Sequence, residues 1–285
     1  MKKTPVAPSR AWFWWIGGSL FFIVLWNILA LSNPAYSSER LLWPAQVAAM
    51  RISKTPNAFP PASVQKTISK LQRVIQRYPG SSSAAQAQLL IGGVYAARKE
   101  YPPSREVFEK VVVDYPNMTN RGIEAYGAIA TTYLAEKQWG KALETYRKIL
   151  TKYPMNMRAM NVPETMVAVA RSKTPDISDA VLREAVQYYR HAIDQSKKGS
   201  GLSLVAQQQL AKCYLLDSRW KEAAQIYETL AMTYFNRREV PLWVKAVEEL
   251  GKKRLENPEL GRNLALRFAE QYPQRRQRVE PWLKK

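Results

Sequence analysis

The sequence contains little cysteine, little histidine and few acidic residues. Its single cysteine, Cys213, excludes a disulfide within the chain and disfavours a cysteine-based zinc site. Its single histidine, His191, excludes a histidine cluster for metal binding or catalysis. Aspartate and glutamate number 23 against 43 lysines and arginines, a formal charge of +20. These counts argue against most metalloenzymes and triad hydrolases, and they favour a binding or scaffolding protein with acidic partners nearby.

The individual candidates for catalysis are also weak. Of the 285 residues, 46% are hydrophobic and 23% are charged, which predicts a packed core rather than disorder. His191 precedes Ala192 in a predicted helix and is expected to pack or to face solvent, and Cys213 is expected to be a buried, inert thiol. The neighbours Glu248 and Glu249 point to different sides of a helix, so they cannot act as a paired acid and base. We therefore expect no enzymatic activity, no cofactor and no metal.

Residues 11–31 form an apolar run long enough to cross a membrane. Lys2, Lys3 and Arg10 precede it, and no charge follows until Glu39. A helix of 21 residues spans about 30 Å, the thickness of the hydrocarbon core of a bilayer. The early basic residues favour a cytoplasmic tail at 1–10 and translocation of the remainder. We predict a signal anchor over 11–31, and hence an inner-membrane, single-pass protein with its body on the periplasmic side.

A cleaved secretory signal is the alternative, with Ala35-Tyr36-Ser37 as its small-x-small cleavage site. The apolar run exceeds the roughly 7–15 residues usual in such signals, which favours the anchor. A buried core helix is a third interpretation, disfavoured by so long an uncharged stretch after a basic start. No cysteine follows the run directly, which excludes lipid attachment of the bacterial lipoprotein kind.

The body of the chain is repetitive. The dipeptide Tyr-Pro recurs at intervals of 37 and 38 residues, and Tyr234-Phe235 lies 38 residues before its last copy. A period in the thirties indicates a solenoid of small helical units. The dipeptides of this periodic series begin at Tyr78, Tyr115, Tyr153 and Tyr272.

The unit 123–154 shows the pattern most clearly. Two stretches with apolar residues at helical spacing flank a turn at 137–140, and a proline ends the second stretch. Small residues at two positions let the paired helices approach, and aromatic residues fill the space towards the next pair. The residues concerned are Ala130, Tyr133, Ala142, Tyr146 and Pro154. This unit resembles a tetratricopeptide repeat.

The same signature fits two further units and weakens elsewhere. In 85–116 it is carried by Gly92, Tyr95, Phe108 and Pro116, and in 204–235 by Ala211, Tyr214, Ala223 and Tyr227. A fourth unit covers about 157–196, 64–79 supplies one helix, and a degenerate unit at 241–273 is expected to cap the array.

The resemblance implies an all-α fold, a TPR-like α-solenoid forming a right-handed superhelix of helix hairpins, with one N-terminal transmembrane helix. We expect the solenoid over 64–273, a Pro/Ser/Ala-rich spacer over 32–63 and a basic C-terminal tail over 274–285. Units that end in Tyr-Pro resemble those of bacterial envelope proteins, among them anchored companions of translocons.

Members of the family bind protein segments in a groove lined by the first helix of each pair. The resemblance places ten residues of this chain in such a groove: Gln86, Leu89, Gly93, Ala97, Glu124, Thr131, Leu134, Gln208, Lys212 and Leu215. This lining is small and mildly apolar, which suits an apolar or helical segment. Alternatively, the small residues only permit tight packing of the superhelix.

Clusters of basic residues occur at the predicted helix ends, for example at 197–198, 237–238 and 275–278. They form either a solvated surface or a patch that attracts anionic lipid or an acidic protein, while nucleic acid is disfavoured by the predicted topology. The sequence thus predicts a membrane-tethered scaffold that binds a protein partner in envelope biogenesis or export. The alternatives are an accessory subunit of a cell-wall or polysaccharide-synthesis complex and a self-assembling scaffold.

Overall fold

The computed structural model describes residue 19 and residues 33–284. Over these residues the chain forms α-helices and short 3-10 helices, without a strand. The predicted membrane span at 11–31 lies outside the described residues, apart from Ser19. Among the helices described, none is both long enough and apolar enough to cross a membrane. The chain divides into two compact units, Met1–Ala128 and Ile129–Lys285.

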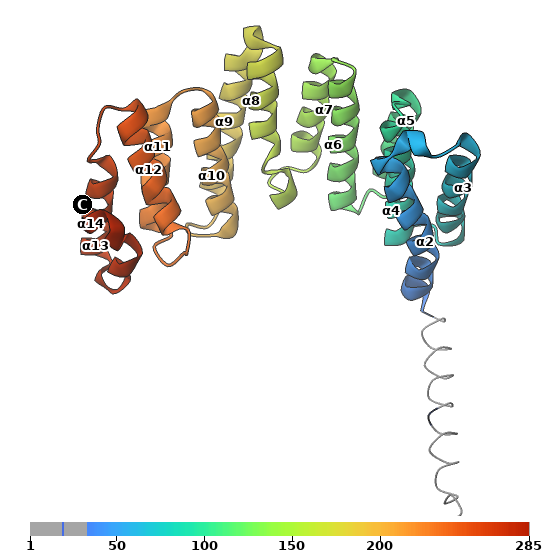
Figure 1. Cartoon of the computed structure of the whole chain (residues 1–285), viewed down its shortest axis with the longest axis horizontal. Coiled ribbons are helices and arrows are strands. Elements are labelled where there is room, and N and C mark those ends of the chain that lie inside the picture. The colour runs from blue at the N-terminus through green and yellow to red at the C-terminus, as the bar shows by residue number, and fades with distance from the viewer. Residues whose placement is uncertain (1–18, 20–32, 285) are drawn as a thin grey trace, which may run out of the picture. The chain divides into compact units, whose positions relative to one another are not determined.

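The described part of unit 1 begins with two helical hairpins, coloured blue to green in Figure 1. The first two helices pack against each other and against the third, and the third packs against the fourth. The helices are α2 (Pro34–Lys54), α3 (Pro61–Arg77), α4 (Ser82–Ala97) and α5 (Tyr101–Asp114), with a short η1 (Pro56–Ala58) after α2. The helix α6 (Thr119–Ala135) follows and runs across the boundary between the units.

The prediction of a spacer over 32–63 is wrong, because α2 occupies most of this segment. Prolines suggested an irregular chain, yet Pro34 and Pro61 are first residues of helices, where the missing N–H costs nothing. Pro44 alone lies inside α2. Leu42 and Ile52 on the inner face of α2 are buried in a core shared with α3 and α4, and this burial offsets the cost of an interior proline.

Unit 2 continues the alternation of paired helices (Figure 1). Each helix from α7 to α13 packs against the next one in the chain. The α-helices are α7 (Trp139–Lys152), α8 (Val162–Lys173), α9 (Ser178–Gln195), α10 (Gly201–Leu216), α11 (Trp220–Thr233), α12 (Val240–Arg254), α13 (Leu260–Gln271) and α14 (Glu280–Leu283). The short 3-10 helices are η2 (Met157–Ala159), η3 (Pro175–Ile177) and η4 (Pro273–Val279).

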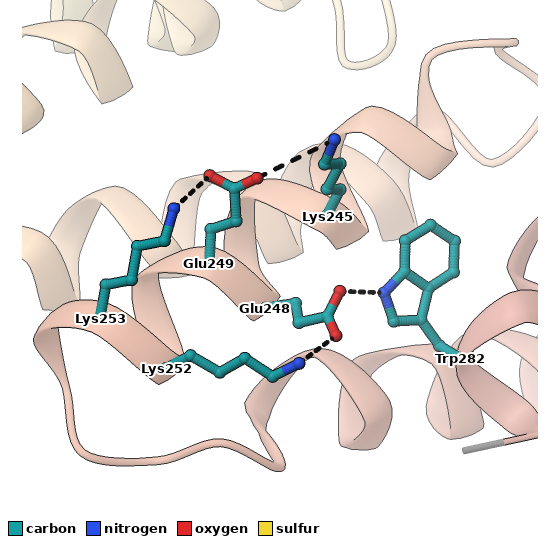
Figure 2. A network of polar contacts seen from close by, with 6 residues as sticks. All are labelled: Lys245, Glu248, Glu249, Lys252, Lys253 and Trp282. Atoms are coloured by element: carbon teal, nitrogen blue, oxygen red, sulfur yellow. Dashed lines mark hydrogen bonds and ion pairs between the residues drawn. The ribbon is translucent and has the colours of Figure 1, made fainter.

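The segment 274–285 is also not a free tail, contrary to the prediction. Val279 is fully buried and Trp282 is 8% exposed, and both belong to the core of α11, α12 and α13. The indole Nε1 of Trp282 donates a hydrogen bond of 2.7 Å to Glu248 Oε2 on α12, as Figure 2 shows. Arg275, Arg276 and Lys284 are exposed, while Val279 and Trp282 close the end of the unit.

The turns within three of the hairpins share one conformation. Lys99, Lys137 and Ser218 have φ values of 61°, 59° and 58°, and each lies two residues before the second helix of its hairpin. This left-handed conformation ends the first helix and reverses the chain within a few residues. The equivalence of these three positions confirms the regular repeat expected for 85–116, 123–154 and 204–235.

We predict opposite effects of alanine at two adjacent glycines of α4. A Cβ on Gly92 would lie 2.6 Å from the ring of the buried Phe108, whereas no atom lies within 4 Å of a Cβ on Gly93. Gly92→Ala should therefore lower the free energy of unfolding by about 1–3 kcal/mol through overpacking. Gly93→Ala should raise it by roughly 0.5–1 kcal/mol through helix propensity. Urea denaturation of the two variants checks this, and equal effects would contradict the close approach at Gly92.

We also predict that the C-terminal segment stabilises unit 2. Trp282→Ala should cost about 3–5 kcal/mol because it empties a buried aromatic site. Trp282→Phe should cost only about 1 kcal/mol, since it keeps the packing and removes the hydrogen bond to Glu248. Leu242→Ala, at a side chain of α12 that is 65% exposed, is the control and should change little. Thermal and urea unfolding measure all three variants.

Candidate protein-binding surface

The signature residues lie where paired helices meet. Ala130, Ala142, Ala211 and Ala223 are fully buried. The aromatic positions fill the adjacent space, with Phe108 4%, Tyr146 7% and Tyr214 3% exposed, while Tyr95, Tyr133 and Tyr227 are half-buried. Pro116 and Pro154 are exposed, each directly after the tyrosine that caps its helix.

Four of the five Tyr-Pro dipeptides mark the ends of second helices, whereas Tyr101-Pro102 begins α5. Tyr78, Tyr115, Tyr153 and Tyr272 are the C-caps of α3, α5, α7 and α13, with φ between −127° and −131° and ψ between 55° and 67°. The following proline disfavours helical geometry at these residues and so ends the helix. Tyr234 caps α11 in a related conformation although phenylalanine follows it. The predicted equivalence of Tyr234 with the Tyr-Pro series is thereby confirmed.

The predicted groove residues of unit 1 differ in what they offer to a partner. Leu89 is only 6% exposed, so most of its side chain is already packed within the unit. Glu124 is exposed and pairs with Arg121 at 3.1 Å, one turn away on α6. The remaining residues, Gln86, Gly93 and Ala97, are half-buried along α4.

In unit 2 the predicted residue Leu215 lines a hollow of about 240 Å³ between α10, α11 and α12. The apolar part of the hollow comes from Leu215, Trp220, Tyr227, Ala246 and Leu250, and its polar rim from Glu249, Lys253 and Arg254. The other predicted residues of this unit do not line it: Thr131 and Lys212 are exposed, and Leu134 and Gln208 are half-buried.

In two places, the last residue of a first helix is a cation that lies over an aromatic ring. That ring belongs to the residue that begins the second helix of the preceding pair. Arg254, the last residue of α12, lies over the ring of Trp220 at 4.9 Å, and Trp220 begins α11. Lys173, the last residue of α8, lies over the ring of Trp139 at 5.7 Å, and Trp139 begins α7. Such cation–π contacts are worth about 0.5–1 kcal/mol at exposed sites. The contact with Trp220 holds the guanidinium of Arg254 at the rim of the hollow.

The rim carries an ordered pattern of charge. Glu249 lies between Lys245 at 4.0 Å and Lys253 at 3.5 Å, with all three side chains on one face of α12 (Figure 2). Glu248, on another side of the same helix, pairs with Lys252 at 2.7 Å and accepts the bond from Trp282. The two neighbouring glutamates therefore serve separate surfaces, as their adjacency predicts.

Two further hollows were not predicted. One, of about 510 Å³, lies in unit 1 against α3, α4 and α5 and includes Ile75, Tyr95 and Val107. The other, of about 370 Å³, lies in unit 2 beside Lys198, Met232 and Tyr272. The repeat pattern locates the first helices of each pair, whereas these hollows depend on the packing of second helices and loops. The sequence shows apolar residues on α3 and α5, such as Ile75 and Val107, but it does not show that they are half-exposed.

Basic residues gather on three loops of unit 2, which follow α9, α11 and α13. The loop after α11 contacts the loop after α13, because Arg275 Nε donates to Asn236 Oδ1 at 3.1 Å and Arg278 donates to the carbonyl oxygen of Phe235 at 3.2 Å. Tyr234 Oη donates at 3.5 Å to the carbonyl oxygen of Ser200, in the loop after α9. Six exposed cations of these loops form no ion pair with another described residue. They are Lys197, Lys198, Arg237, Arg238, Arg275 and Arg276.

Cys213 and His191 lie in different environments. Cys213 is fully buried in α10, and burial raises the pKa of its thiol from 9.0 to about 12, with the nearby Glu164 acting in the same direction. His191 is exposed on α9. In the described part of the chain, no group of three histidine, cysteine or acidic residues could hold a metal ion. The expected burial of the thiol is confirmed, and its inertness stays a prediction.

The paired helices, the buried small residues and the capped helix ends define a helical-repeat scaffold. The tetratricopeptide repeat model matches residues 86–117 and 125–154, which coincide with two of the repeats predicted from the signature. The model covers 62 of the 285 residues and identifies these two segments as tetratricopeptide repeats. A search of curated protein sequences finds no match.

Several solved structures are similar to this chain. Two are crystal structures of nearly identical TPR-like repeats of a putative kinesin light chain from Podosopora anserina, both 16% identical. The first, a variant of these repeats, covers 74% of this chain and 96% of its own at a TM-score of 0.40, and the second covers 78% and 99% at 0.41. The third, BtubC (BKLC) from P. vanneervenii, is 10% identical and covers 73% and 88% at 0.46. At this level of similarity, the names of these proteins say nothing about the partner of this chain.

We predict that Cys213 resists thiol reagents in the folded protein and lowers stability at alkaline pH. The folded pKa is about 12, so the folded state keeps the proton above pH 9 while the unfolded state loses it. The contribution of Cys213 to stability is therefore complete below pH 9 and is lost as the pH rises towards 12. The difference in unfolding free energy between wild type and Cys213→Ala should shrink over this interval. Fast labelling of the native thiol at pH 8 would contradict its burial.

Proposed function

We propose that this protein is a membrane-tethered scaffold that binds an apolar or helical segment of a protein partner on the outer side of the bacterial inner membrane. The observation that carries the binding function is the hollow at Leu215, bordered by Trp220 and Tyr227 and rimmed by Arg254. Aromatic residues and arginine supply most of the energy in protein interfaces. Tetratricopeptide repeats in general suggest a protein-interaction scaffold.

The size of this hollow favours one anchoring side chain of a larger partner. Its volume of about 240 Å³ is below the roughly 300–1,000 Å³ of small-molecule sites. The apolar residues Leu215 and Leu250 suit an aliphatic or aromatic anchor, and Lys253 and Arg254 at the rim suit an acidic residue beside it. The uncompensated cations on the loops of unit 2 would speed the encounter with an acidic partner.

The tether rests on the sequence of residues 1–31, with its basic start and apolar run. The alternative cleavage site Ala35-Tyr36-Ser37 lies in the first turn of α2. Cleavage after Ser37 would remove the first turn of α2 together with its cap, in which Asn33 Oδ1 accepts the N–H of Ala35 at 2.9 Å. An uncleaved anchor keeps this cap, so the structure of α2 favours the anchor. Tethering would raise the effective concentration of the scaffold towards other membrane components.

Affinity capture of the full-length, membrane-extracted protein tests the binding site through two adjacent leucines. Leu215 lines the hollow, whereas Leu216 is 40% exposed and does not line it. We expect Leu215→Asp to abolish capture of the partner and Leu216→Asp to retain it, because a carboxylate cannot enter an apolar site unpaired. Lys253→Glu at the exposed rim should weaken capture without touching the apolar lining.

Circular dichroism and thermal unfolding of each variant separate lost binding from lost folding. A partner captured equally by both aspartate variants would exclude the hollow as the binding site. Membrane fractionation of a 1–32 deletion tests the tether independently, since the deleted chain should leave the membrane fraction. Concentration-dependent sedimentation would reveal a self-assembling scaffold, and a captured cell-wall or polysaccharide enzyme would favour an accessory subunit.

A further inference from the structure

Helix α2 has two faces of different character. Its inner face carries Leu42, Ala45 and Ile52, which are at most 5% exposed and pack in the core of unit 1. Its outer face carries Tyr36, Trp43 and Met50, which are 49%, 66% and 48% exposed. The inner face explains why the helix is part of the fold, whereas nothing in the described part of unit 1 covers the outer face.

The three exposed side chains form one line, which we name the α2 stripe (Tyr36, Trp43 and Met50). They are seven residues apart, which is almost two helical turns, so they point in nearly the same direction. The stripe is about 21 Å long at 1.5 Å per residue. Val47 lies half-buried beside it on the same side. Three large apolar side chains exposed along one side of a surface helix favour an interaction site.

The charges around the stripe are mainly basic. Arg40, Arg51 and Lys54 are exposed on α2, against a single acidic residue, Glu39. None of these four side chains forms an ion pair with another residue that the structure describes. A helix with aromatic residues on its outer face and free cations beside them has the composition of a helix that lies in a membrane interface.

The chain places this helix directly after the apolar run. Residues 11–31 end three positions before Pro34, the first residue of α2. Tyr36 lies five residues after Leu31, so even a fully extended chain keeps it within about 18 Å of the end of the run. Asn33 is extended, with φ −78° and ψ 114°, and α2 starts at the next residue, Pro34.

We propose that the α2 stripe lies in the headgroup region of an anionic bilayer, with Arg40, Arg51 and Lys54 contacting lipid phosphates. This inference rests on the proposed tether, which brings α2 to the membrane surface. Tyrosine and tryptophan prefer the interface between hydrocarbon and water, and anionic lipids attract adjacent cations. Helices α3 and α4, which pack on the inner face of α2, are then held on the side away from the bilayer.

The experiment uses the full-length protein in vesicles of phosphatidylcholine with phosphatidylglycerol, in a Cys213→Ala background. Met50→Cys is labelled with an environment-sensitive fluorophore, and Val113→Cys is the matched control, because Val113 is 74% exposed in the same unit on α5. With brominated lipids, we expect roughly threefold stronger quenching at position 50 than at position 113, with a blue shift of its emission. Adding Trp43→Asp to the labelled Met50→Cys chain should abolish both effects.

Flotation of the vesicles separates the two proposals. A chain that does not float overturns the tether and the inference together. A chain that floats, but whose label at position 50 is as weakly quenched as the one at 113, overturns the inference alone. A label that is shielded from water and not quenched by brominated lipid shows that a second copy of the chain or a protein partner covers the stripe, which also overturns it.

Discussion

The close approach of paired helices is the constraint on which the rest of the structure depends. It is possible only where one helix presents glycine or alanine to the other, as at Gly92 against Phe108. Gly261 has the same role in the degenerate last pair, where an added Cβ would lie 2.5 Å from that of Glu248. The aromatic residues of the signature can fill the space between pairs only because the small residues fix how far apart the helices lie.

Proline positions set where these helices begin and end. A proline in the first turn starts a helix, as at Pro34 and Pro61, and a proline after a C-cap tyrosine ends one, as at Pro154. The same residue type therefore has opposite meanings at positions that composition cannot distinguish. This ambiguity explains why 32–63 reads as a spacer, although α2 completes a hairpin with α3.

The candidate site is assembled from residues that are far apart in the repeat. Leu215 ends a first helix, Trp220 begins the second helix of the same pair, and Leu250 and Arg254 come from the first helix of the next pair. The repeat signature identifies Leu215 as a groove position, because this position of the repeat faces the groove in members of the family. The contributions of Trp220 and Arg254 depend on how neighbouring pairs stack, and stacking leaves no local pattern in the sequence. Leu89, another predicted groove position, is instead packed within unit 1.

The sequence alone was sufficient for the repeat, its period and the small and aromatic positions of three units, because these follow from local spacing and side-chain size. It was also sufficient for the burial of Cys213, since a lone cysteine at an apolar helical position is normally buried. The helical state of 34–54, the packing of Trp282 and the outward face of Tyr36, Trp43 and Met50 required tertiary structure. Each of these depends on which partner surface a segment meets, and burial against distant residues outweighs the local preference of the chain.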